Sequence, residues 1–165
     1  MQVMGVKITV QNANRIKQVL RKDAPRILRD NIMRALARLG EECVIKVRSR
    51  SGEESWYDQT GNLRSSVGYG AYDYGKKYVE SAFDTIKSGG EGSAEGQKYL
   101  HEIAEQYQKC FALVIVAGMS YAEYVEAKDS KDVLASTELW ARKQVNDYID
   151  KGIERACKQI NAMLV

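Results

Sequence analysis

Residues that could carry acid-base or nucleophilic chemistry are sparse in this 165-residue chain. The single histidine, His101, has no serine, cysteine or second histidine at a spacing typical of a catalytic triad or a zinc-binding helix. We therefore interpret His101 as a surface residue of a helix. The three cysteines, Cys43, Cys110 and Cys157, are odd in number and widely spaced, which indicates buried thiols in a reducing compartment.

Two polar segments resemble ligand-binding loops without matching them. Residues 89–98, GGEGSAEGQK, contain neither glycine pattern of a nucleotide-binding loop, and their two glutamates would repel phosphate, so we expect a flexible surface turn. Glu126, Asp129 and Asp132 are interrupted by two lysines and lack the glycine of a calcium loop. Asp132 or Ser136 suits the N-cap of a following helix instead. We expect no catalytic residue, metal site or cofactor.

Charge is distributed unevenly along the chain. Residues 1–50 hold 12 Lys/Arg against 4 Asp/Glu, a net charge of +8, whereas residues 51–165 hold 13 against 18, a net charge of -5. A basic surface of this kind can stay solvated, pair with the acidic part of a second copy, or bind nucleic-acid phosphates. Few aromatic residues lie among the basic ones, which disfavours a platform for single-stranded nucleic acid. The candidate interface residues in this basic segment are Arg26, Arg29, Arg34 and Arg38.

Aromatic residues add a second candidate interface. Most of the ten tyrosines lie between Tyr57 and Tyr124, and tyrosine suits surfaces that are apolar in body and wet at the tip. Trp56 and Tyr57 stand in a polar stretch, where an exposed tryptophan requires either a partner or folding back onto the domain. We expect the loop of residues 50–62 to extend away from the subunit and become fixed against a neighbour.

Hydrophobic periodicity predicts the elements that position these residues. The chain reads as a single α+β domain, residues 1–165, with an antiparallel sheet of about four strands and long N-terminal and C-terminal helices packed on one face. Its expected parts are a strand at 3–10, a basic helical part at 14–49 with a short and a long helix, a loop at 50–62, a sheet with an inserted helix at 63–127 and a C-terminal helix at 136–164. Within the sheet part we expect strands at 67–74, 78–86, 111–117 and 121–127, and a helix at 97–109.

No stretch of the sequence is apolar and long enough to cross a membrane. The longest uncharged apolar run, residues 111–119, is about half the required length. The first ten residues lack the charged and apolar regions of a secretory signal peptide, so we expect the protein to stay where it is made.

Two motifs together resemble a known family. Residues 58–67, DQTGNLRSSV, follow the long basic helix, and residues 114–126, VIVAGMSYAEYVE, precede the last helix. In this order they resemble the small tail-component family of tailed phages, named after the gene-10 product of a lambda-like coliphage. The residues that carry the resemblance are Thr60, Gly61, Asn62, Leu63, Arg64 and Ser65 in the first motif and Tyr121, Tyr124 and Glu126 in the second.

The resemblance implies a structural role without catalysis. Members act at the head-to-tail joint or complete the tail, so the expected partners are other copies in a ring and the phage connector and tail-tube proteins. The expected location is the virion, and the host bacterial cytoplasm during assembly. The chain departs from the family where Ala127-Lys128-Asp129 replaces a frequent glycine, and residues 88–109 resemble an insertion. A sequence-independent nucleic-acid-binding module that uses the basic helix is the alternative, with DNA as its partner.

One contact between the two motifs can be predicted. Leu63 and the Tyr124-Val125 pair both suit burial on the sheet, which would partly withdraw Arg64 and Glu126 from water. Such charges are costly unless paired, and arginine suits a bidentate contact with a carboxylate. We predict an Arg64–Glu126 ion pair, with two unrelated solvated side chains as the alternative.

Overall fold

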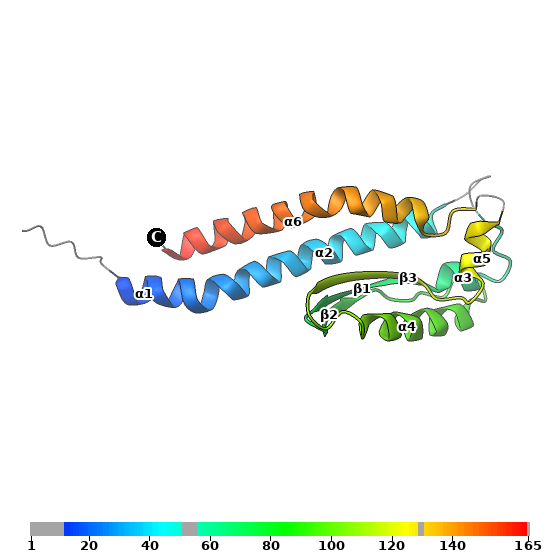
Figure 1. Ribbon diagram of the computed structural model, residues 1–165, viewed down its shortest axis with the longest axis horizontal. Helices are drawn as coiled ribbons and strands as arrows, with labels where there is room; N and C mark the ends of the chain where they lie inside the picture. Colours follow the sequence, from blue (N-terminus) through cyan, green and yellow to red (C-terminus); the bar gives the residue numbers. More distant parts are fainter. Residues whose placement is uncertain (1–11, 51–55, 129–130, 165) are drawn as a thin grey trace, which may run out of the picture.

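A long helical rod is the dominant feature of the computed structural model, which describes residues 12–50, 56–128 and 131–164 (Figure 1). The rod consists of α1 (Ala13–Gln18), a π-helical turn η1 (Val19–Asp23) and α2 (Ala24–Arg48). Apolar residues spaced three or four apart bury one face of α2, from Ile27 to Val47. The strand expected at 3–10 lies outside the described residues.

The short and long helices expected at 14–49 form one continuous rod. Pro25 occupies the first turn of α2, and a proline here removes a hydrogen bond and crowds the carbonyl four residues earlier. The backbone accommodates Pro25 by widening: the Ala24 N–H bonds to the Val19 carbonyl, five residues back. The helix therefore continues through the proline where the sequence suggested a break.

Three antiparallel strands form the sheet, in the order β2-β1-β3. The hairpin expected near residue 75 is confirmed: β1 (Val67–Asp73) turns into β2 (Lys76–Glu80) through Tyr74 and Gly75, both with positive φ, the geometry of a tight hairpin turn. The second strand differs from the expected 78–86, because it begins at Lys76 and residues 81–86 are in no strand. Strand β3 (Phe111–Ala117) is also confirmed, and it pairs with β1 along its whole length.

The elements stack in layers (Figure 1). Helix α2 lies on one face of the sheet and α4 (Gly90–Ala104) covers the other. The C-terminal helix α6 (Ala135–Leu164) runs along α2 on the side away from the sheet, where the Asn31 Nδ2 donates to Gln159 Oε1 at 3.1 Å. Both long helices thus lie on one side of the sheet, as expected, but it is α2 that packs directly on the strands.

Two predicted elements are wrong. Residues 121–127 were expected as a strand but contain helix α5 (Ala122–Ala127), which buries Ala122 and partly buries Val125 one helical turn apart. Residues 89–98 were expected as a flexible turn but begin α4. Gly92 and Gly96 face α3 (Asn62–Ser65) and Ser66, which follows it, because a Cβ on Gly92 would overlap the backbone of Asn62 and one on Gly96 the carbonyl of Ser66. The glycines serve close packing between helix α4 and its neighbours.

None of the helices in the described parts of the chain is long and apolar enough to cross a membrane.

Candidate functional site

The first motif forms a turn held by a buried carboxylate. Gly61 has a φ of 84° and is followed directly by the short helix α3 (Asn62–Ser65). Asp58 Oδ1 accepts a hydrogen bond from the Gly61 N–H at 3.0 Å, and Asp58 Oδ2 accepts one from the Arg64 N–H at 3.1 Å. A glycine is required at position 61, because a Cβ there would collide with the Ile86 carbonyl and the backbone angle is left-handed.

Arg64 reaches from α3 to the end of the long helix. Its two terminal nitrogens donate to the carbonyls of Arg48 at 2.6 Å and Arg50 at 2.8 Å. Its guanidinium carbon lies 4.7 Å from the centre of the Trp56 ring, a cation–π distance. Arg64 thereby satisfies carbonyl groups that the end of a helix leaves without an intrahelical partner.

Two further arginines extend this contact to the rest of the fold. Arg48 donates to the Val67 carbonyl of β1 at 2.8 Å, and Arg50 donates to the carbonyls of Asp132 and Val133, both at 2.6 Å. Arg48, Arg50 and Arg64, which we call the arginine junction, join α2, α3, β1 and the start of α6. The junction holds the rod and the sheet in a fixed relation.

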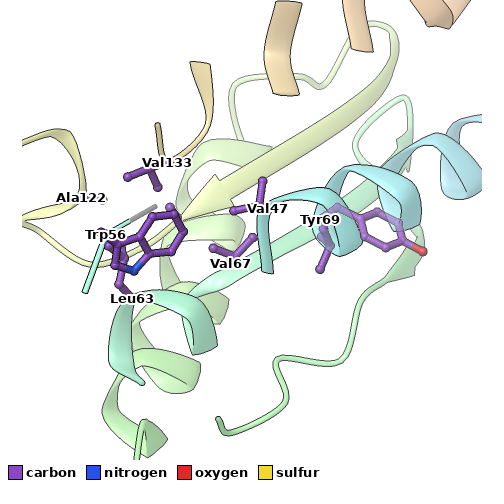
Figure 2. Packing of buried hydrophobic residues seen from close by; sticks show 9 residues of the cluster. Val47, Trp56, Leu63, Val67, Tyr69, Ala122 and Val133 are labelled. Carbon is purple, nitrogen blue, oxygen red and sulfur yellow. The ribbon is translucent and has the colours of Figure 1, made fainter. Parts of the chain in front are cut away.

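Trp56 is the apolar centre beneath the junction. Figure 2 shows its indole ring among Leu63, Val67 and Val133, and only 6% of the residue is exposed. Of the two alternatives for Trp56, the structure shows folding back onto the domain: the side chain is buried in its own chain, which contradicts an interface role for Trp56. Its neighbour Tyr57 is 86% exposed. Residues 51–55 of the expected mobile loop lie outside the described residues.

The last residue of the second motif, Glu126, caps the start of the last helix. Glu126 Oε1 accepts hydrogen bonds from the backbone N–H groups of Leu134 and Ala135, and Asp132 Oδ1 accepts one from Ser136. Carboxylates at this position stabilise a helix N-terminus. The predicted Arg64–Glu126 ion pair is wrong. Glu126 caps the start of α6, whereas Arg64 Nε lies 3.9 Å from the Asp58 carboxylate and its terminal nitrogens bind the carbonyls of Arg48 and Arg50.

The two motifs nevertheless meet in one core. Leu63 from the first and Ala122 from the second belong to the same buried cluster as Trp56. Tyr124 of α5 is 65% exposed, and Tyr121, which directly precedes α5, is 39% exposed. Partial burial and the nearby carboxylates of Asp58 and Glu91 raise the pKa of Tyr121.

Polar residues of the first motif also fix α4. Asn62 Oδ1 accepts from the Gly92 N–H at 3.3 Å, which caps the first turn of α4 from a different helix. The Ser65 hydroxyl oxygen accepts from the Ile86 N–H at 2.8 Å, and the Thr60 carbonyl accepts from the Ser88 N–H at 3.1 Å. The motif side chains thus bind neighbouring segments of the same chain.

The four candidate interface arginines lie on the exposed side of α2. Three have acidic partners: Arg26 lies 3.9 Å from Asp23, Arg29 lies 3.2 Å from Asp73, and Arg34 lies 2.7 Å from Asp30. Tyr78 of β2 donates to the Asp30 carboxylate, so this basic surface continues to the β2 edge of the sheet. Arg38 is exposed beside α6.

A small titratable cluster joins β2 to α4. His101 lies on the exposed side of α4, as expected, and contacts Glu80 at 3.1 Å. Burial alone would raise the pKa of Glu80, but hydrogen bonds from His101, Tyr72 and Lys77 outweigh it and lower that pKa. Burial and the bond to Glu80 raise the pKa of Tyr72. The contacts of Glu80 with His101 and Tyr72 therefore connect β2 to α4 and to β1.

The cysteines are not all buried, contrary to expectation. Cys43 is buried in α2, and burial raises the pKa of its thiol to about 11, whereas Cys110 and Cys157 are exposed. Across the three described ranges, no group of three or more His, Cys, Asp or Glu side chains is placed to hold a metal ion.

The sequence did not point to Arg48 and Arg50 as junction residues, or to Asp58 as the carboxylate that holds the turn of the first motif. Arg48 and Arg50 were counted as part of a basic surface. Their position at the end of a long helix was the available signal, since basic side chains there can bind the last carbonyls. Asp58, three residues before a glycine, had the spacing of a side chain that closes a turn.

Comparisons with known proteins give no match: no family model, curated protein or solved structure is significantly similar to this chain.

Proposed function

We propose that this protein is a non-enzymatic virion assembly subunit that acts in a ring at the head-tail connection or tail end of a tailed phage. The observation that supports the proposal is the location of the motif residues. Arg64 and Asn62 of the first motif and Glu126 of the second bind helix ends within the same chain. Such residues hold the elements of a subunit in fixed positions, which a subunit that connects larger assemblies requires.

Two unlike surfaces on one subunit also support a ring. A head-to-tail interface uses a different patch on each side, and a closed rotation turns a series of such interfaces into a ring. The basic side of α2 continues to the β2 edge of the sheet through Arg34 and Tyr78. At the opposite edge, β3 borders an apolar groove that includes Leu113 and Val145. Unlike patches on opposite edges suit serial contact between copies.

The experiment is disruption of the gene in the phage or prophage that encodes it, followed by electron microscopy of induced lysates. We expect DNA-filled heads and tails that are separate or incomplete, with joined particles restored by the wild-type gene in trans. Joined, infectious particles at normal yield in the disrupted strain would contradict the proposal.

A second candidate function, sequence-independent nucleic-acid binding, is favoured by the free end of the rod. Arg15, Lys17, Arg21 and Lys22 are exposed there, and none forms an ion pair with the described residues. Retention of duplex DNA that weakens steeply with salt, and weakens further when Arg21 and Lys22 are changed to glutamine, would support this function. No retention at low salt would remove it.

A further inference from the structure

The outer edge of β3 is the feature of the fold that most requires a partner. In the order β2-β1-β3, β3 has a paired neighbour on one side among the described residues. Two hydrogen bonds flank the pairing of β1 with β3: the Tyr74 N–H donates to the Cys110 carbonyl, and the Gly118 N–H donates to the Ser66 carbonyl. They fix which residues of β3 are hydrogen-bonded to β1, namely Ala112, Val114 and Val116.

The alternate residues of β3 direct their backbone groups the other way. The N–H and C=O groups of Phe111, Leu113 and Ile115 point outward from the ladder. Natural edge strands usually carry a lysine, a proline or a bulge that prevents pairing with another chain. β3 reads FALVIVA and has no charged residue or proline, so its edge is open to a further strand.

An apolar groove runs along this edge, and we call it the β3 groove. Its larger part has a volume of about 670 Å³ and its smaller part about 250 Å³. Leu36 of α2 and Val145 of α6 form one wall, and Ile103 of α4 forms the other, so both walls rise beside the strand. Phe111, Leu113 and Ile115 are only half-buried at its floor.

The chain contains a segment whose pattern matches the groove. Residues 3–10, VMGVKITV, alternate apolar and polar positions, with Met4, Val6, Ile8 and Val10 on one face. The segment has eight residues and β3 has seven, so a single added strand would span the edge. One face of such a strand would cover the apolar wall of α2 and α6.

This segment cannot lie along the whole of β3 in its own chain. Val10 precedes Ala13, the start of α1, by three residues, a reach of at most about 11 Å. The end of β3 nearest to α1 lies beside Arg29, whose guanidinium carbon is 6.0 Å from the centre of the Phe111 ring. Sixteen helical residues from Ala13 to Arg29 rise more than about 20 Å, so Val10 stays well short of this end and only the first residues of the segment could approach it. A strand that spans the full edge must therefore come from another copy.

We propose that the β3 groove binds residues 3–10 of a second copy, which add a fourth strand to the sheet at β3. Each copy would donate this segment and accept one from its neighbour, so the contact is head-to-tail and repeats from copy to copy. Main-chain hydrogen bonds to Phe111, Leu113 and Ile115 would supply affinity, and the apolar face would fix the register. The inference concerns how copies join and does not depend on a virion role.

The principal test compares one new residue on the two faces of the donor segment of the full chain. Ile8→Lys places a charge on the apolar face, and Thr9→Lys places the same residue on the other face. We expect sedimentation equilibrium to show self-association at least tenfold weaker for Ile8→Lys and nearly unchanged for Thr9→Lys. Hydrogen exchange at the amides of Phe111, Leu113 and Ile115 should be slow in the assembly and fast after dilution.

Equal weakening by both variants, a chain that stays monomeric at high concentration, or rapid exchange of these three amides in the assembled state would overturn the proposal. A normal phage phenotype with intact strand exchange would contradict the virion role alone.

Cys110 provides a second test, because it is exposed and directly precedes β3. The acceptor copy keeps Cys110 and carries Cys157→Ser. The donor copy carries Cys110→Ser and Cys157→Ser, together with one new cysteine in the donated segment, either Gly5→Cys or Thr9→Cys. Oxidation of the mixture should link the two copies through one of these positions, which gives the direction of the added strand. The absence of any link between copies, or a disulfide within one dilute chain that holds both cysteines, would overturn the proposal.

Discussion

The arginine junction and the β3 groove border the same sheet but have opposite character. At the junction, Arg64 and Arg50 bind backbone carbonyls of α2 and of the segment before α6, above a buried tryptophan. Along the β3 groove, apolar side chains are half-exposed and outward backbone groups have no strand beside them among the described residues. The junction is completed within one chain, whereas the groove needs material from elsewhere.

This difference separates residues that maintain the subunit from residues that join it to others. Substitutions in the junction should lower the free energy of unfolding of an isolated chain. Substitutions in the groove should leave that free energy nearly constant and change association. Each prediction below measures one side of this contrast.

The largest loss of folding stability is expected for Arg64→Ala. The substitution leaves the carbonyls of Arg48 and Arg50 without their donor and removes the cation from the Trp56 ring. We expect a loss of about 3 kcal/mol in the free energy of unfolding, since hydrogen bonds from a charged donor contribute more than neutral ones. Denaturant unfolding measures it, and Arg64→Lys should recover part of the loss. A change below about 0.5 kcal/mol would show that the junction is dispensable.

The next largest loss of folding stability is expected at the glycines that bring α4 against α3. A Cβ at Gly92 would lie 1.9 Å from the Asn62 carbonyl oxygen, whereas one at Gly90 meets nothing within 4 Å. We expect Gly92→Ala to destabilise the protein by about 2 kcal/mol through overpacking. Gly90→Ala, the matched control in the same helix, should be neutral or stabilising by up to about 1 kcal/mol. Thermal unfolding of the two variants would contradict this account if their midpoints moved together.

A charge placed inside the β3 groove should weaken self-association of the chain. Ala141 of α6 lines the groove, and glutamate is a good helix former, so Ala141→Glu should change the free energy of unfolding by no more than about 0.5 kcal/mol. Self-association should weaken about tenfold, because the added strand would cover a buried carboxylate. Lys143→Glu on the exposed side of α6 is the control. Equal association of the two variants, measured by sedimentation velocity, would place the contact elsewhere.

The smallest change in folding stability is expected for the cluster around Glu80, which joins β2 to α4, and this change depends on pH. The pKa of Glu80 is lowered in the folded state, so its ionised form contributes stability above its unfolded pKa of about 4.3. That contribution is lost as the pH falls through the folded pKa. We expect Glu80→Gln to show a flatter loss of stability than the wild type below pH 5, with urea unfolding as the measurement. Parallel curves for the two proteins would contradict the assignment.

Periodicity predicted the long elements because a single pattern extends over many residues. The α2 stripe from Ile27 to Val47 and the apolar run of β3 each specify one element, and both occur where expected. The short α5 was misread because Tyr121, Tyr124 and Val125 favour strands, a weak local preference that tertiary packing of Ala122 overrides.

The junction was harder to predict because it depends on residues distant in sequence. Glycines in GGEGSAEG suggest flexibility, and their use for close packing becomes visible only with Asn62 and Ser66 beside them. Arg64 donates to two backbone carbonyl groups, which every residue carries and no sequence pattern distinguishes, and its Nε lies 3.9 Å from Asp58 Oδ2. Charge complementarity alone suggested Glu126, which caps another helix.

The pairing of α2 with α6 has a consequence for synthesis of the chain. Asn31 of α2 meets Gln159 of α6, and the whole sheet unit is encoded between the two helices. At a translation rate of about 5–20 residues per second, α2 leaves the ribosome on the order of ten seconds before α6 can cover it. Its apolar stripe is open to chaperones and to wrong partners during that interval, so the yield of native protein should depend on translation speed across residues 49–134.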